Sequence, residues 1–186
     1  MNNFYDWFNE HVTDEMINHF TDRTNKHMDL VQKYCKIIDG LFPNRFPGLI
    51  ERGRTHDDSK FSQYELEPYI ILTEKHRTKR VDNIDLELPD FVQEAMDDAW
   101  VHHYTVNDHH MNFYVPEVDG FTKVEVMPDK AVAEMCADWF AMSEELDSHT
   151  LDWVEDHMNV KWSVSKSIED LIFEILNKVL ETGKGQ

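Results

Sequence analysis

The chain has 186 residues, of which 41% are hydrophobic and 12% aromatic, enough for one domain with a sizeable core. Its formal net charge of −19 at pH 7 repels nucleic-acid backbones and anionic membrane surfaces. These totals argue against binding to long nucleic acids or to membranes. They leave open a small phosphorylated ligand, provided that its site carries its own cations.

The first residues, "MNNFYDWFNEHVTDEM", carry charges where a signal peptide would have an apolar region. No stretch approaches the roughly 18 consecutive apolar residues of a membrane span. The two cysteines, Cys35 and Cys136, have no CxxC spacing, and reduced thiols are the simplest interpretation. We therefore expect a cytoplasmic protein.

The pattern predicts a single all-α domain of the helical-bundle type over residues 1–186, without repeats. Apolar residues recur at a helical period from Thr13 to Ile38, and "DGLFPNRFPG" ends that helix with its glycines and prolines. A short helix is expected from Leu49 through the stretch "THDD". Ser62 and Glu65 resemble a capping box that opens the next helix.

In the second half, Asp90 and Gln93 predict a helix start, and that helix runs on to about His103. Residues 111–128 are predicted to form a small irregular or β-hairpin insertion, in which "FTKVEV" alternates apolar and polar residues. Asp129 is expected to cap a helix over about 130–146. The metal-site core is thus about 13–146, followed by a structural helix over about 165–180 and a frayed tail over 181–186.

Histidine is the unusual count, because the chain has 11. A histidine-rich surface is one explanation. The spacing suggests another, in which successive predicted helices each supply candidate metal ligands. These are His27, His56, Asp57, His103, His109, His110 and Asp138.

Neutral imidazoles and carboxylates together suit one or two divalent ions such as Mn, Fe, Co or Zn. His103 and His110 are seven residues apart, so they share a face if their helix is continuous. If that helix ends near Asn107, both His109 and His110 can turn toward the site. The sequence leaves open which of these two is a direct ligand.

Asp138 lies in the apolar stretch "EMCADWFAM", where a buried lone carboxylate would be costly. It is therefore expected to be paired, capped or metal-bound, unless it faces solvent. Lys60 follows Asp57 by three residues and is a natural clamp for a phosphate oxygen. Asp58 is expected to cap a turn or to orient a ligand histidine.

Two further cations, Arg54 and Arg77, are candidates for binding the substrate beside Lys60. Arg77 lies in "EKHRTKR", residues 74–80, which holds four of the chain's 18 lysines and arginines. That stretch is either a charged loop or helix end, or a lid that attracts phosphate. His103 is favoured over its neighbour His102. Five other histidines have no such company and are assigned to ordinary surface or core roles: His11, His19, His76, His149 and His157.

The ordered set His27, "HDDSK" (56–60), His103, His109–His110 and Asp138 resembles the HD-domain superfamily of metal-dependent phosphohydrolases, specifically its dinuclear subset. The resemblance implies a helical core with these residues as ligands. The stretches "AWVHHYTVNDHH" and "EMCADWFAMS" also look like an uncharacterised HD-like family of small bacterial and phage proteins. The segment "HHMNFYVPEVDGF" lacks the GYP motif of the enzymes that act on cyclic di-GMP.

From this resemblance we expect hydrolysis of a nucleotide or a similar small phosphorylated substrate, with Asp57 and Lys60 as the catalytic residues. A mixed-valent diiron oxygenase on the same scaffold is an alternative, because the ligand set suits it equally well. A non-catalytic metal-binding protein that contacts a partner through its acidic surface is another. A homodimer is possible, and the sequence does not decide it.

Overall fold

The computed structural model describes residues 3–115 and 120–183. Contacts between Cα atoms divide the chain into two compact units, each made of two separate segments. The first unit comprises Met1–Asn25 and Asp57–Val106, and the second comprises Lys26–His56 and Asn107–Gln186. The assignment of the whole chain to a single domain stays a prediction.

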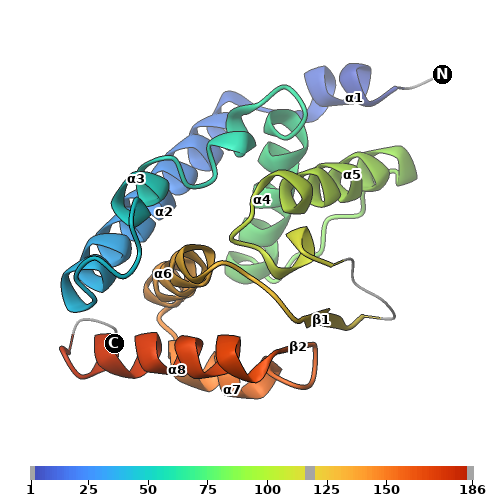
Figure 1. Ribbon diagram of the computed structural model, residues 1–186. Helices are drawn as coiled ribbons and strands as arrows, with labels where there is room; N and C mark the ends of the chain where they lie inside the picture. The colour runs from blue at the N-terminus through green and yellow to red at the C-terminus, as the bar shows by residue number, and fades with distance from the viewer. Residues whose placement is uncertain (1–2, 116–119, 184–186) are drawn as a thin grey trace. The chain divides into compact units, whose positions relative to one another are not determined.

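The described residues are mostly helical, which confirms the predicted all-α class with a small insertion (Figure 1). The α-helices are α1 Phe4–His11, α2 Asp14–Leu41, α3 Leu49–Arg54, α4 Leu66–Val81, α5 Asp90–Val106, α6 Asp129–Leu146, α7 Thr150–His157 and α8 Lys166–Leu180. Two 3-10 helices, η1 Asp58–Phe61 and η2 Met111–Phe113, and two strands, β1 Thr122–Val124 and β2 Trp162–Val164, complete the list. None of the described helices is long and apolar enough to cross a membrane.

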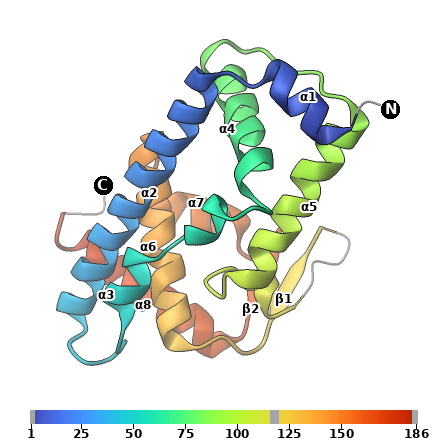
Figure 2. The same cartoon turned by 90° about the horizontal axis from the view of Figure 1, so that it is seen from above.

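The first unit is built around α4 and α5, which pack against each other, with α1 against α5 (Figure 2). Its apolar interior consists of two small clusters. One is centred on Phe20 of α2 and Tyr69 and Ile70 of α4. The other is centred on Ile71 of α4 and Met96 of α5.

The second unit has the larger core, in which α6 packs on α8 and α3 and also contacts α7. The helical period of α8 buries one complete face, as predicted, with the residues Ile168, Leu171, Ile172, Ile175, Leu176 and Val179. The middle of α6 is buried nearly all round, because it lies between other elements of the unit. This burial fixes the helix that carries Asp138.

The two strands pair in parallel, with Thr122 opposite Trp162 and Val124 opposite Val164. The strand predicted in "FTKVEV" therefore exists, but its partner comes from beyond α7, so it is not an arm of a hairpin within 111–128. Residues 116–119 of that segment, with Pro116, and residues 184–186 of the predicted tail lie outside the described residues. Residues 181–183 form a turn.

Several boundaries differ from the prediction. The short helix ends at Arg54 and does not run through the HD stretch. The capping box is wrong, because α4 begins at Leu66, after Glu65, and the side chain of Ser62 does not cap it. The N-cap of α6 is Pro128, not Asp129. Helix α5 ends at Val106, next to Asn107, which meets the condition under which His109 and His110 can both turn inward.

Candidate metal centre

The HD dipeptide lies in a turn between α3 and η1. His56 is only 2% exposed, and Asp57 has the left-handed backbone angles φ 60° and ψ 14°. Aspartate is one of the few residues other than glycine that adopt this conformation readily. The boundary between the two units falls between these two residues, so His56 belongs to the second unit and Asp57 to the first.

In the second unit, His27 from α2, His56 and Asp138 from α6 converge. The His27 Nε2 atom lies 3.1 Å from Asp138 Oδ1, and His56 Nε2 lies 3.9 Å from the same oxygen. The two rings are 5.5 Å apart, and one ligand atom from each of the three residues lies within 4.8 Å of the others. Asp138 is therefore not the solvent-facing residue of the alternative interpretation.

The second ring nitrogen of each histidine is held by a further carboxylate. His27 Nδ1 donates to Glu145 Oε1 (2.8 Å), and His56 Nδ1 donates to Glu134 Oε1 (2.9 Å). This is the arrangement by which proteins fix the tautomer and orientation of a metal-binding histidine, because it leaves the Nε2 lone pair for the ion. The donor set therefore fits a divalent metal, and this buried cluster could bind one.

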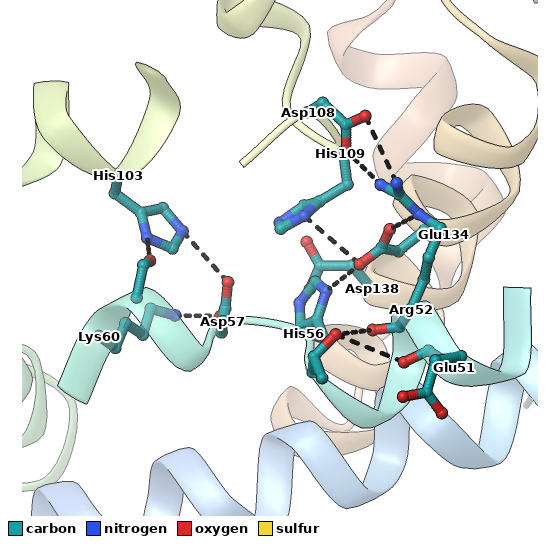
Figure 3. A network of polar contacts seen from close by, with 12 residues as sticks. Glu51, Arg52, His56, Asp57, Lys60, His103, Asp108, His109, Glu134 and Asp138 are labelled. Atoms are coloured by element: carbon teal, nitrogen blue, oxygen red, sulfur yellow. Dashed lines mark hydrogen bonds and ion pairs between the residues drawn. The ribbon is translucent and has the colours of Figure 1, made fainter. Parts of the chain in front are cut away.

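The Glu134 carboxylate contacts His56, Arg52 and His109 (Figure 3). Its side chain also accepts from Arg52 Nε (2.5 Å), and Arg52 in turn pairs with Asp108. His109 Nδ1 lies 3.6 Å from Glu134, and its ring is 4.2 Å from that of His56. One ligand atom each from His56, His109 and Glu134 also lies within 4.8 Å of the others, so these residues are a second possible ligand set in this unit.

The first unit holds a similar arrangement around His103 on α5. Its Nε2 lies 3.2 Å from Asp57 Oδ1, and its Nδ1 donates to Glu65 Oε2 (2.9 Å). Glu65 is fully buried and also accepts from His102. Lys60 Nζ lies 2.5 Å from Asp57 Oδ2. Figure 3 marks this ion pair with a dashed line. The predicted proximity of Lys60 and Asp57 thus holds, although it arises in a 3-10 turn.

These contacts change proton affinities in the first unit. Burial disfavours the charged form of His103, but hydrogen bonds to Asp57 and Glu65 outweigh burial and raise its pKa above the ordinary value. Burial also acts to raise the pKa of Glu65. The hydrogen bonds from His103 and His102 overcome this effect, and the pKa of Glu65 is lowered.

The three predicted substrate-binding cations share one feature, since each pairs with an acidic residue three positions earlier in the chain. Arg54 forms an ion pair with Glu51 (2.6 Å), and Arg77 forms one with Glu74 (2.5 Å). Lys60 is paired with Asp57 in the same way. The stretch containing Arg77 is the second half of α4, which agrees with the helix-end interpretation rather than the loop. A phosphate would have to compete with a carboxylate for each of these cations.

The structure thus brings the predicted ligands together in two groups, His27, His56, His109 and Asp138 in one unit and Asp57 and His103 in the other. His110 contacts His109, with ring centroids 4.1 Å apart, and its role as a ligand stays a prediction. So does a single dinuclear centre. Asp58 is exposed, and the histidines assigned to ordinary roles include His11 and His157, which bond carbonyls of their own helices.

Sequence reasoning missed the carboxylates that hold the histidines: Glu65, Glu134 and Glu145. One signal was available for Glu134, because it precedes Asp138 by one helical turn in the same apolar stretch. Glu65 was interpreted as a helix cap. Glu145 gave no signal, because it lies in an acidic stretch at the end of α6.

A family model matches residues 16–180, almost the whole described chain, and its description is "Family of unknown function (DUF5662)". The comparison with the curated proteins gave no match. The comparison with the solved structures gave none either.

Proposed function

This chain belongs to the DUF5662 family, whose function is unknown, and we propose that it is a metal-dependent phosphohydrolase acting on a nucleotide or similar small phosphorylated substrate. One observation carries the proposal. His27 and His56 direct their Nε2 atoms at Asp138, while Glu145 and Glu134 hold their Nδ1 atoms. The resemblance of the ordered ligands to the HD-domain superfamily supports the same reaction class.

The residues that would hold the metal are His27, His56 and Asp138, with His109 beside them. Two imidazoles and one carboxylate suit Mn, Fe, Co or Zn, and a set of three protein ligands is typical of catalytic sites that keep a position open. A bound divalent ion supplies an activated water and stabilises charge on phosphoryl oxygens.

The protein's own groups have separate tasks in this proposal. Glu145 and Glu134 keep the imidazoles in one tautomer and one orientation. Arg52 holds the Glu134 carboxylate in place through its ion pair. Lys60, Arg54 and Arg77 are the proposed phosphate contacts, and a phosphate would have to displace the carboxylate with which each of them is paired.

The test is metal analysis of the purified protein, followed by assays of phosphate release from nucleoside mono-, di- and triphosphates with Mn, Co, Fe and Zn. We expect a bound transition metal and metal-dependent release. Asp138→Asn should reduce both, because it removes the charged oxygen that both histidines approach. Asp98→Asn is the matched control, because Asp98 is exposed on α5.

Absence of any bound or bindable metal would overturn the proposal. So would a metal-loaded protein that releases no phosphate from any of these substrates. Assays run under nitrogen separate hydrolysis from oxygenation, since hydrolysis proceeds without oxygen. Turnover that requires oxygen would assign the site to an oxygenase instead.

A further inference from the structure

A second feature of the second unit is a pocket of about 140 Å³ at the C-terminal end of α6. Four of its lining residues, Trp139, Met142, Ser143 and Leu146, follow the i, i+3, i+4, i+7 pattern of one helix face. Ser148 and Trp153 complete it. A cavity of roughly 150 Å³ is large enough for a group the size of benzene.

Two tryptophans form the walls of this pocket. The rings of Trp139 and Trp153 have centroids 5.5 Å apart and planes inclined by 56°. Each is stacked on a further ring, Trp139 on Trp162 (5.6 Å) and Trp153 on His157 (4.5 Å). These stacking contacts hold the two rings at a fixed angle, and both rings line the same pocket, where one small group can contact each of them.

The chain around the pocket is acidic. From Asp147 to Asp156 it has four acidic side chains and no lysine or arginine. All four, Asp147, Asp152, Glu155 and Asp156, are exposed, and none forms an ion pair with any residue that the structure describes. This differs from Glu144, just before them, which is paired with Lys33 (2.6 Å).

One polar group also lines the pocket. The side chain of Ser143 belongs to a residue that is only 9% exposed, and its hydroxyl makes no hydrogen bond to another described residue. Its oxygen reaches the pocket surface, so a water or a ligand in the pocket can form a hydrogen bond with it.

We propose that this pocket binds a small organic cation with a methylated ammonium head. The faces of tryptophan rings attract cations, and methyl groups on the nitrogen fill apolar space that a bare, strongly hydrated ammonium would not. The unpaired carboxylates supply a field of the right sign. The same carboxylates would repel a phosphate, so this pocket would not bind the substrate of the proposed phosphohydrolase. The proposal for the pocket does not depend on the proposed function.

The probes are choline and its uncharged analogue of the same shape, 3,3-dimethylbutan-1-ol, titrated into the full-length protein by calorimetry at low ionic strength. We expect choline to bind about tenfold more tightly than the alcohol. This is the expected size of a cation–π interaction at a partly exposed site together with the attraction of the nearby carboxylates. Added KCl should weaken choline binding, because it screens the exposed carboxylates. Equal affinities, or no binding of choline, would overturn the proposal.

The variant Trp153→Leu should lose choline binding. Trp100→Leu is the matched control, since Trp100 is similarly exposed (52% against 40%) but lies on α5. If Trp153→Leu disturbs the fold, the double variant D152N/D156N tests the charge contribution and should weaken choline but not the alcohol. Unchanged choline affinity in the folded variants contradicts the assignment.

Discussion

Three buried imidazoles of the candidate ligands, those of His27, His56 and His103, each lie between two carboxylates. His27 contacts Glu145 and Asp138, and His103 contacts Glu65 and Asp57. A neutral imidazole has one N–H to donate, so the second carboxylate attracts either another proton or a metal ion to its side of the ring. At the scale of single residues, this is the reason why these histidines differ from His11 or His157, which bond only a backbone carbonyl in the contacts described above.

The variant Glu145→Ala tests this reasoning in the second unit. It removes the acceptor of His27 Nδ1 and leaves the imidazole free to rotate and to change tautomer. We expect the affinity for Zn²⁺ to fall about 10–100-fold, the usual effect of losing such a partner. Competition with a coloured chelator measures the affinity. Glu155→Ala, an exposed acid on α7, is the control, and equal affinities of the two variants would contradict the role of Glu145.

The ligand candidates could be predicted because histidines and an aspartate in apolar helices are conspicuous. Their carboxylate partners could not, since the chain has 37 acidic residues and only tertiary contacts with the histidines distinguish these three. Glu65 shows the difficulty. Its spacing from Ser62 matches the capping-box pattern. In the structure, its carboxylate instead accepts hydrogen bonds from His102 and His103.

At the scale of elements, the approach of α3 to α2 positions His56, which follows α3 by two residues. Gly53 makes this approach possible. A Cβ atom there would lie 2.8 Å from Cys35 Sγ and 3.1 Å from Gln32 Cα. The backbone of α2 cannot move away without disturbing the core in which Cys35 is fully buried.

Gly53→Ala should therefore destabilise the protein by about 1–3 kcal/mol, the usual cost of overpacking. Gly40→Ala, at the end of α2, is the control, because nothing lies within 4 Å of the added atom. We expect Gly40→Ala to be neutral or to stabilise by about 0.5–1 kcal/mol. Urea unfolding followed by circular dichroism measures both. A Gly53→Ala variant as stable as the wild type would show that α3 moves freely on α2.

The long helices could be predicted from the sequence because each buries a stripe of regular period, as α8 does. The prediction missed α1 and α7, which are eight residues long and rich in charged and aromatic residues. It also missed β2. A three-residue strand has too few positions for a pattern, and its partner β1 is far away in the sequence, so only the folded chain defines it.

At the scale of the whole molecule, the net charge of −19 is the dominant electrostatic feature. With 37 acidic and 18 basic side chains, many carboxylates have no cation to pair with. Their mutual repulsion opposes the folded state, in which they are closer together than in the unfolded chain. The protein is therefore expected to be sensitive to ionic strength.

Raising KCl from about 0.05 M to about 0.5 M should stabilise the metal-free protein, because the screening length falls below the spacing of surface charges. A gain of about 1 kcal/mol corresponds to a rise in Tm of about 2–4 °C for a chain of this size. Differential scanning calorimetry measures it. A Tm that falls with salt would mean that surface ion pairs such as Lys33–Glu144 outweigh the repulsion.

The hydrogen bond between His27 and Glu145 joins residues 118 positions apart, and the one between His56 and Glu134 joins residues 78 apart. Closing such long loops costs entropy and slows folding, so we expect these contacts to form late. During synthesis, the two histidines emerge long before Asp138 and both glutamates. A nascent chain therefore carries the imidazoles without the carboxylates that orient them. The metal would enter an almost complete protein, as a final step of maturation and not as a nucleus for folding.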